Sequence, residues 1–177
     1  MSLDLRIIAA VASNGVIGKR GDIPWHIPDD LKISKIDFWI SNNYGRRTFD
    51  SVYGRLGKPL PNWDNIVLTR NKNFDSEGIF VVYSFDDALD IAVDLNDTAY
   101  CIGGNEVFIM TLGSPLMRKM YITEIDMEFD GDAYFPDFDK NEWRETARIN
   151  RNYTNKIGEE ISYSFVTYEK SWKIKVY

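Results

Sequence analysis

The sequence predicts an α/β fold built on a mostly parallel sheet. Short apolar runs typical of buried strands alternate with segments of helical character, and turn residues such as glycine and asparagine separate them. Strands joined by crossover helices lie parallel in one sheet. The chain has 177 residues, of which 44% are hydrophobic and 27% charged, and this fits one globular domain over residues 1–177.

The elements follow from local patterns. Apolar runs predict strands at residues 5–12, 65–69, 79–82, 99–102, 120–125 and 162–168. Helices are expected to begin near Pro28, after Gly45, at Ser84 and at Asn105. Ser84 with an acid three residues later is typical of a capped helix start, and that helix should run to about residue 95. Residues 13–24 are expected to form a long loop and residues 150–160 a hairpin loop. Residues 41–43 fit no element, and residues 38–40 could be a strand or the end of the preceding helix.

Composition excludes several classes of function. The net charge of −6 argues against a nucleic-acid partner. A single cysteine, Cys101, allows no internal disulfide, and a single histidine, His26, argues against a zinc site. The acidic residues between Asp130 and Asp139 lack the EF-hand spacing, so we interpret them as a solvated loop and expect no metal. The chain start is not a signal peptide and no apolar run could span a bilayer, so we expect a cytoplasmic monomer.

A carboxylate is expected to face a pocket from the helix that begins near Pro28. The small residues Ala9 and Ala10 would let a flat ring lie against their strand, and the loop at 13–24 could fold over that ring. Burial raises the pKa of such a carboxylate, and this suits acid chemistry. An acid pair at a helix start can also simply favour the helix. We assign that simpler role to Asp29 and the pocket role to Asp30.

Two further segments could hold phosphates. Gly45 precedes a helix start and is followed by Arg46 and Arg47, which could join Arg70 in clamping a phosphate, although a solvated basic turn explains the same residues. Gly103–Gly104 joins a buried strand to a helix, where backbone N–H groups could approach a pyrophosphate. This segment lacks the Gly-x-Gly-x-x-Gly pattern of the Rossmann fold, and a plain strand-to-helix turn is the alternative.

Together these segments resemble the dihydrofolate reductase family. Five motifs stand in family order from about Leu5 to Tyr168: the Ala-Ala strand, Val-Ile-Gly with Pro-Trp and Pro-x-Asp-Leu, Gly-Arg-x-Thr-Phe, Ile-Gly-Gly, and Tyr-Ile-Thr with a later Gly-Asp and Phe-Pro. The resemblance implies a three-layer fold with helices on both faces of the sheet and an antiparallel C-terminal strand. It implies NADPH-dependent reduction of 7,8-dihydrofolate to tetrahydrofolate, which supplies one-carbon metabolism.

The resemblance also implies residue roles. Asp30 would hold the pterin ring, with Thr123 as its hydroxyl partner and Trp25 beside them; alone, Thr123 would be an ordinary β-favouring surface residue. The remaining substrate-binding residues would be Ile8, Ala10, Ile23, Leu31, Val52, Leu60 and Ile102. The cofactor-binding residues would be Ala10, Ile17, Gly18, Gly45, Arg46, Arg47, Thr48, Leu68, Thr69, Arg70, Ile102, Gly103, Gly104, Asn105, Glu106, Val107 and Phe108.

Departures from the family pattern leave two alternatives open. Trp63 stands where the family commonly has an arginine for the folate carboxylate, and Arg55 or Lys58 could substitute. A polar segment, residues 41–44, replaces an apolar strand, Ser34 replaces a large aromatic, and Phe108 replaces a frequent tyrosine. The alternatives are a reductase of another heterocycle, such as the pyrimidine reductase type, and a non-catalytic protein that retains the fold.

Overall fold

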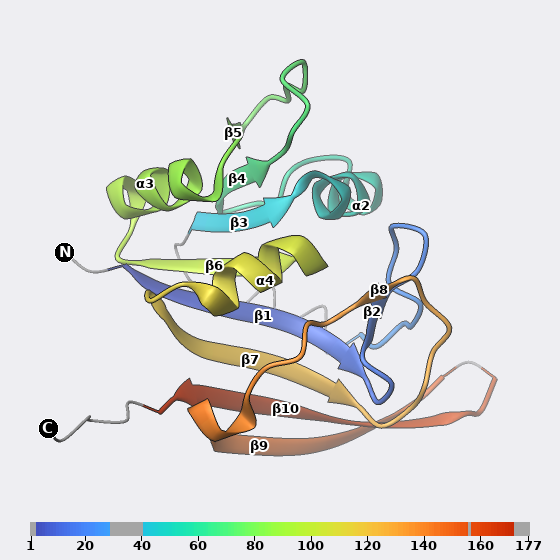
Figure 1. Cartoon of the computed structure of the whole chain (residues 1–177). Coiled ribbons are helices and arrows are strands. Elements are labelled where there is room, and N and C mark those ends of the chain that lie inside the picture. The colour runs from blue at the N-terminus through green and yellow to red at the C-terminus, as the bar shows by residue number, and fades with distance from the viewer. Residues whose placement is uncertain (1–2, 29–40, 156, 172–177) are drawn as a thin grey trace, which may run out of the picture.

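The fold is an eight-stranded, mostly parallel sheet with helices on both faces (Figure 1). The structure is a computed structural model, and it describes residues 3–28, 41–155 and 157–171, with the backbone alone for residues 41–44. The strand order is β5-β4-β3-β6-β1-β7-β10-β9. Its strands are β1 (Asp4–Ala12), β3 (Ser41–Gly45), β4 (Asp64–Leu68), β5 (Ile79–Val82), β6 (Thr98–Gly103), β7 (Met117–Ile125), β9 (Trp143–Thr154) and β10 (Glu160–Lys170).

Six neighbouring strands, from β5 to β7, are parallel, and the C-terminal hairpin of β9 and β10 is antiparallel. A second small sheet pairs β2 (Val16–Gly18) with β8 (Ala133–Tyr134). The helices are α2 (Arg46–Leu56), α3 (Phe85–Leu95), α4 (Asn105–Gly113) and the short 3-10 helix η1 (Lys140–Glu142). The predicted α/β class and its mostly parallel sheet are confirmed.

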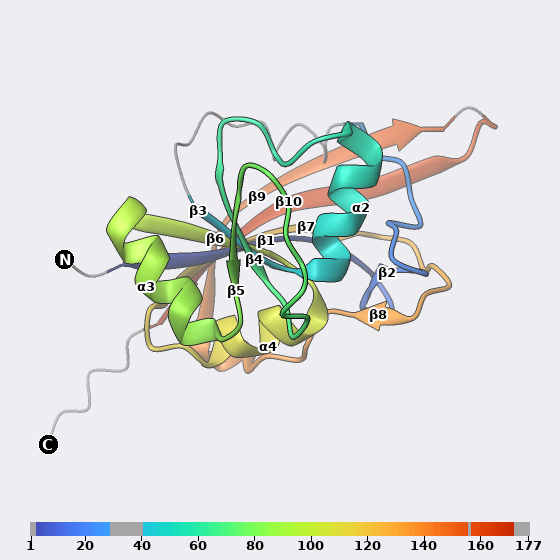
Figure 2. The same cartoon turned by 90° about the horizontal axis from the view of Figure 1, so that it is seen from above.

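The helices lie on opposite faces of the sheet because neighbouring residues of a strand point in opposite directions. In β4, Ile66 packs in the cluster of Ala88 and Ala92 from α3, whereas Val67 packs with Phe49 from α2. Viewed from above, α3 and α4 lie along one side of the sheet and α2 rises from the other (Figure 2). No helix among the described residues is long and apolar enough to cross a membrane.

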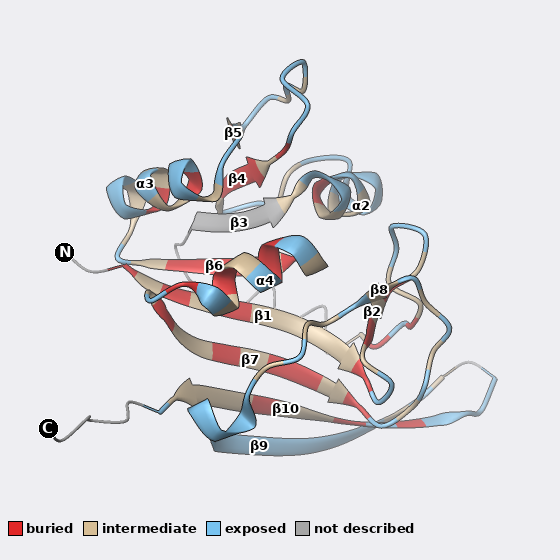
Figure 3. Ribbon diagram, viewed as in Figure 1, coloured by how far each residue is buried: buried red, intermediate tan, exposed pale blue. Residues whose placement is uncertain are grey.

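Two segments differ from the sequence-based expectation. Residues 41–45, which fit no element and are polar where an apolar strand was expected, form β3 in the middle of the sheet, paired with β4 and β6. The expected hairpin loop at 150–160 is wrong in extent, because β9 continues to Thr154 and β10 begins at Glu160. Figure 3 shows why β9 escaped detection: the strand is almost entirely exposed, so it carries no apolar alternation.

Candidate functional site

The carboxyl ends of three neighbouring strands define the candidate site. β3, β6 and β1 are adjacent and parallel, so their chains all leave the sheet at the same edge. β3 leads directly into α2, and β6 leads into α4. In open α/β sheets, ligands bind outside this edge of the strands.

The starts of α2 and α4 meet at glycines. Gly45 and Gly104 are the N-cap residues, and neither helix has a side-chain cap. A Cβ atom on Gly45 would lie 3.4 Å from Cγ2 of Val107 and 3.8 Å from the backbone nitrogen of Gly104. The first backbone N–H groups of a helix have no partner within it. Two such starts side by side therefore suit a ligand with phosphate groups.

The Gly103–Gly104 peptide lies next to the first turn of α2. It is a cis peptide, and Gly103 has φ = +123°, a conformation that strongly favours glycine. Oγ1 of Thr48, in the first turn of α2, lies 3.5 Å from the position that a Cβ would take on either glycine. Glycine at both positions thus allows the close approach of β6 to α2.

The three predicted phosphate-binding arginines have different surroundings. Arg46 pairs with Asp50 one turn later, at 3.5 Å, and its guanidinium carbon lies 5.0 Å from the centre of the Phe74 ring. Arg70 pairs with Glu106 of α4 at 3.1 Å, with both side chains largely exposed. Arg47 is exposed, and the first turn of α2 contains no acidic residue.

The small residues Ala9 and Ala10 lie on β1, the strand next to β6, and β1 pairs in turn with β7. Ala10 of β1 is in register with the buried Thr123 of β7. Trp25 is buried and packs against Phe129, with ring centroids 5.1 Å apart. Its indole Nε1–H has no hydrogen-bond acceptor among the described residues. A buried donor of this kind requires a partner, so a polar group is needed here beyond the described contacts.

The predicted loop at 13–24 is anchored to the segment that carries β8. The Asp132 backbone N–H donates to the Gly18 carbonyl at 3.0 Å, and the Asp132 carboxylate accepts from the Arg20 backbone N–H at 3.0 Å. Lys19 pairs with Asp130 at 2.6 Å. The four aspartates of this stretch are exposed, as predicted for a solvated loop, and two of them, Asp130 and Asp132, also hold the loop at 13–24.

Comparison with known proteins shows which family the chain resembles. Residues 4–170 match the family model described as dihydrofolate reductase. A dihydrofolate reductase of Bacillus subtilis is 36% identical over 167 residues, which cover 94% of each chain. One from Haloferax volcanii is 36% identical over 170 residues, which cover 93% of this chain and 82% of that protein.

The chain belongs to the dihydrofolate reductase family.

A solved structure agrees with this assignment. The dihydrofolate reductase from Enterococcus faecalis, complexed with NADP(H) and RAB-propyl, superposes with a TM-score of 0.83 at 31% identity. The superposition covers 97% of this chain and all of that chain. The resemblance inferred from five short motifs and the expected three-layer fold are both confirmed.

The dihydrofolate reductase motifs converge in space, with one gap. Asp30, together with Asp29, Leu31 and Ser34, lies outside the described residues. Several predicted substrate residues are partly buried, namely Ile8, Ala10, Ile23, Val52, Leu60 and Ile102. Asn65, a buried residue that sequence reasoning did not select, donates from Nδ2 to the Leu60 and Trp63 carbonyls and so fixes the 60–63 turn.

The predicted cofactor residues divide into those at the surface of the site and those beneath it. Phe108 is buried and packs against Phe135, with ring centroids 5.0 Å apart, so it supports the Gly103 backbone from below. Leu68 packs in the core, and Oγ1 of the buried Thr69 accepts a hydrogen bond from the Asn71 backbone N–H. Asn105, at the start of α4, donates from Nδ2 to the Tyr134 carbonyl at 2.6 Å.

The two proposed substitutes for the missing arginine at position 63 have different contacts. Arg55 forms an ion pair with Asp22. Lys58 is exposed. Trp63 itself stands edge-on to Tyr100, with ring centroids 5.9 Å apart, and the Arg6 guanidinium carbon lies 5.7 Å from the centre of the same Tyr100 ring.

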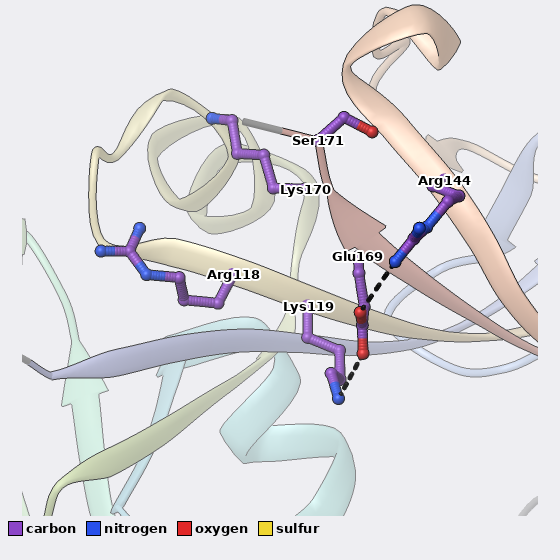
Figure 4. A pocket seen from close by; sticks show the side chains of 6 residues that line it. All are labelled: Arg118, Lys119, Arg144, Glu169, Lys170 and Ser171. Atoms are coloured by element: carbon purple, nitrogen blue, oxygen red, sulfur yellow. Dashed lines mark ion pairs between the residues drawn. The ribbon is translucent and has the colours of Figure 1, made fainter. Parts of the chain in front are cut away.

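A second depression lies at the opposite edge of the sheet, where β7 begins and β10 ends. Its lining residues are Arg118, Lys119, Arg144, Glu169, Lys170 and Ser171 (Figure 4). Glu169 pairs with Lys119 at 2.8 Å and with Arg144 at 3.8 Å. This depression lies away from the carboxyl ends of β1, β3 and β6, and none of the family motifs contributes to it.

Proposed function

We propose that this chain catalyses the NADPH-dependent reduction of 7,8-dihydrofolate to 5,6,7,8-tetrahydrofolate. The observation that carries the proposal is the contact between two uncapped helix starts, at Gly45 and at Gly103–Gly104, close to the sheet face that carries Ala10 and Thr123. Phosphates bind at such helix starts, and the small side chain of Ala10 leaves room for a flat ring against that face. Family membership supplies the reaction class.

The cofactor lies along the starts of α2 and α4 in this proposal. Arg47 and Thr48 bind phosphate oxygens, and the backbone at Gly103 and Gly104 approaches the pyrophosphate. Arg46 and Arg70 add positive charge while remaining paired with Asp50 and Glu106. When bound, NADPH supplies the hydride, which passes to C6 of the pterin.

In this proposal the pterin lies against the face of β1 and β7 that carries Ala10 and Thr123. Asp30 holds the ring and favours its protonated form, and the Thr123 hydroxyl orients the Asp30 carboxylate. Trp25 and Ile23, on the anchored loop, exclude bulk water from the reacting atoms. A water molecule delivers the proton that N5 gains.

The test uses two neighbouring acids. NADPH oxidation is followed by absorbance with dihydrofolate for the wild type, Asp30→Asn and Asp29→Asn. We expect Asp30→Asn to lose about a hundredfold in kcat near neutral pH, the range for loss of an acid–base group, while it keeps NADPH binding. Asp29→Asn is the matched control and should retain the wild-type rate.

The outcomes separate the alternatives. Wild-type turnover by Asp30→Asn would reject the role of that carboxylate. NADPH oxidation with a ribityl pyrimidine but not with dihydrofolate would favour the pyrimidine reductase alternative. No saturable quenching of tryptophan fluorescence by NADPH would favour a non-catalytic protein.

A further inference from the structure

The 19–22 turn of the loop at 13–24 is built as a rigid unit. The backbone N–H groups of Lys19 and Asp22 donate to each other's carbonyls, at 2.7 and 3.0 Å. The central residues, Arg20 and Gly21, have φ values of 52° and 80°. Positive φ at both central positions is the geometry of tight two-residue hairpin turns. Asp22 is therefore carried in a fixed position, and its Oδ1 also accepts a hydrogen bond from the Ile23 backbone N–H.

This turn is held on one side by short backbone contacts. Gly18 and Arg20 bond to Asp132, as described above. A Cβ on Gly131 would lie 2.4 Å from Cγ1 of Val16 and 2.6 Å from the Gly18 carbonyl oxygen. The 130–132 segment therefore packs on β2 too closely for any side chain at Gly131.

On its other side the turn contacts α2 through Asp22, whose carboxylate forms an ion pair with Arg55 in the last turn of that helix. Both views show the loop standing between α2 and the β2–β8 pair (Figures 1 and 2). The hydrogen bond from the Arg55 guanidinium lowers the pKa of Asp22. The Asp22 side chain is 65% exposed and the Arg55 side chain 37%.

These contacts link α2, the loop, β8 and α4 in a closed series of interactions, which we call the circuit. It runs from Arg55 of α2 to Asp22, through the loop to β8, from the Tyr134 carbonyl to Asn105 of α4, and back to α2 where Gly104 meets Gly45. Two exposed ion pairs lie in the circuit: Lys19–Asp130 has backbone hydrogen bonds beside it, and Arg55–Asp22 joins the loop to α2 through side chains. Exposed ion pairs are weak and are screened by salt. The circuit should open at the Arg55–Asp22 pair.

We propose that Arg55 is a positioning residue whose ion pair with Asp22 holds the loop closed over the bound ligands and slows their release. The proposal rests on the proposed function, because the ligands are those of the reductase. Arg55 acts only through Asp22 and the loop. It is therefore not available as a substitute for the arginine missing at Trp63.

The experiment measures the NADPH dissociation rate by stopped-flow competition, in the wild type, Arg55→Gln, Asp22→Asn and the double variant. Each single change should accelerate dissociation about twofold to fivefold, the range for an exposed ion pair. The double variant should be no faster than either single variant, because both remove one interaction.

Three controls isolate the ion pair. Lys19→Gln removes the exposed pair with Asp130 on the side already held by backbone bonds, and it should leave the dissociation rate unchanged. Raising the salt concentration should reduce the difference between wild type and Arg55→Gln. Arg55→Lys, which keeps the charge, should lie close to wild type.

Several results would overturn the proposal: equal rates for all variants, additive effects of the two single changes, or an equal effect of Lys19→Gln. If NADPH binds saturably and these results are found, the loop proposal alone fails. If NADPH does not bind to the wild type, the proposed function fails as well.

Discussion

The described helices begin in two different ways, and the difference identifies the site. α3 is complete in itself: Oγ of Ser84 accepts a hydrogen bond from the Asp87 backbone N–H at 3.0 Å, and Asp86 and Asp87 place negative charge in the first turn. α2 begins at Gly45 with no side-chain cap and with Arg46 and Arg47 in its first turn. Negative charge stabilises a helix start and positive charge does not.

The start of α2 lacks both a side-chain cap and negative charge, and a ligand bound there can supply both. A start that carries two cations and no cap is unfavourable for the helix alone. A phosphate group would supply both the missing acceptors and the missing negative charge. α4 shares the uncapped glycine start but has one acid, Glu106, which pairs with Arg70.

The largest effect should come from reversing the charge at the start of α2. Arg47→Glu should weaken NADPH binding about a hundredfold, since charge-assisted hydrogen bonds contribute roughly 1.5–3 kcal/mol and a repulsion replaces them. The same change should stabilise the protein without cofactor by roughly 0.3–1 kcal/mol, because an acid now meets the helix dipole. Fluorescence titration and urea unfolding measure the two effects.

The charge control for this prediction is Arg144→Glu, at the opposite edge of the sheet. It makes the same change in net charge and should leave NADPH binding within about twofold of wild type, because salt screens charges at that separation. If Arg47→Glu bound NADPH as tightly as the wild type, the start of α2 would be no more a cofactor site than the start of α3.

A smaller effect is expected from filling the space between the helix starts. Gly45→Ala places a methyl group 3.4 Å from Cγ2 of Val107. We expect NADPH binding to weaken about tenfold, or about 1.4 kcal/mol, as the phosphate loses its close approach to backbone. Gly54→Ala, in the same helix with nothing within 4 Å, should instead stabilise the protein by about 0.5–1 kcal/mol. Equal titration curves for the two variants would contradict the prediction.

The smallest effect on the site should come from α3, where the cap serves the helix alone. Ser84→Ala should lower the free energy of unfolding by about 1 kcal/mol and leave NADPH binding unchanged. Ser84→Thr keeps the hydroxyl and should retain most of the stability. If Ser84→Ala weakened NADPH binding as much as Gly45→Ala does, the loss of binding in both variants would reflect general destabilisation of the protein.

Local patterns were sufficient for most of the sheet and for α3. The apolar runs of β1, β5, β6, β7 and β10 and the Ser84 cap are signals within a few residues of the element that they specify. The motifs around Gly45 and Gly103–Gly104 were likewise visible as helix starts. The convergence of these two motifs was expected only from the resemblance.

Other features could not be read from local sequence. β3 is polar in sequence yet lies in the centre of the sheet, because its backbone pairs with strands on both sides and strand pairing does not require apolar side chains. β9 has a nearly fully exposed surface and therefore no alternating pattern. The contacts by which Asp130 and Asp132 hold the 13–24 loop could not be predicted, since their partners, Lys19 and Arg20, lie more than a hundred residues away in the chain.

The sequence by itself determined the family, the order of most of the strands and helices, and the glycines and arginines offered to a cofactor, because each is a short pattern with its own physical signature. Only the tertiary structure decided which charges are paired. Arg55 and Asp22 are 33 residues apart in sequence, and whether their side chains meet depends on where α2 ends and how the 19–22 turn is held. An ion pair depends on distance in space, and separation along the chain does not specify that distance.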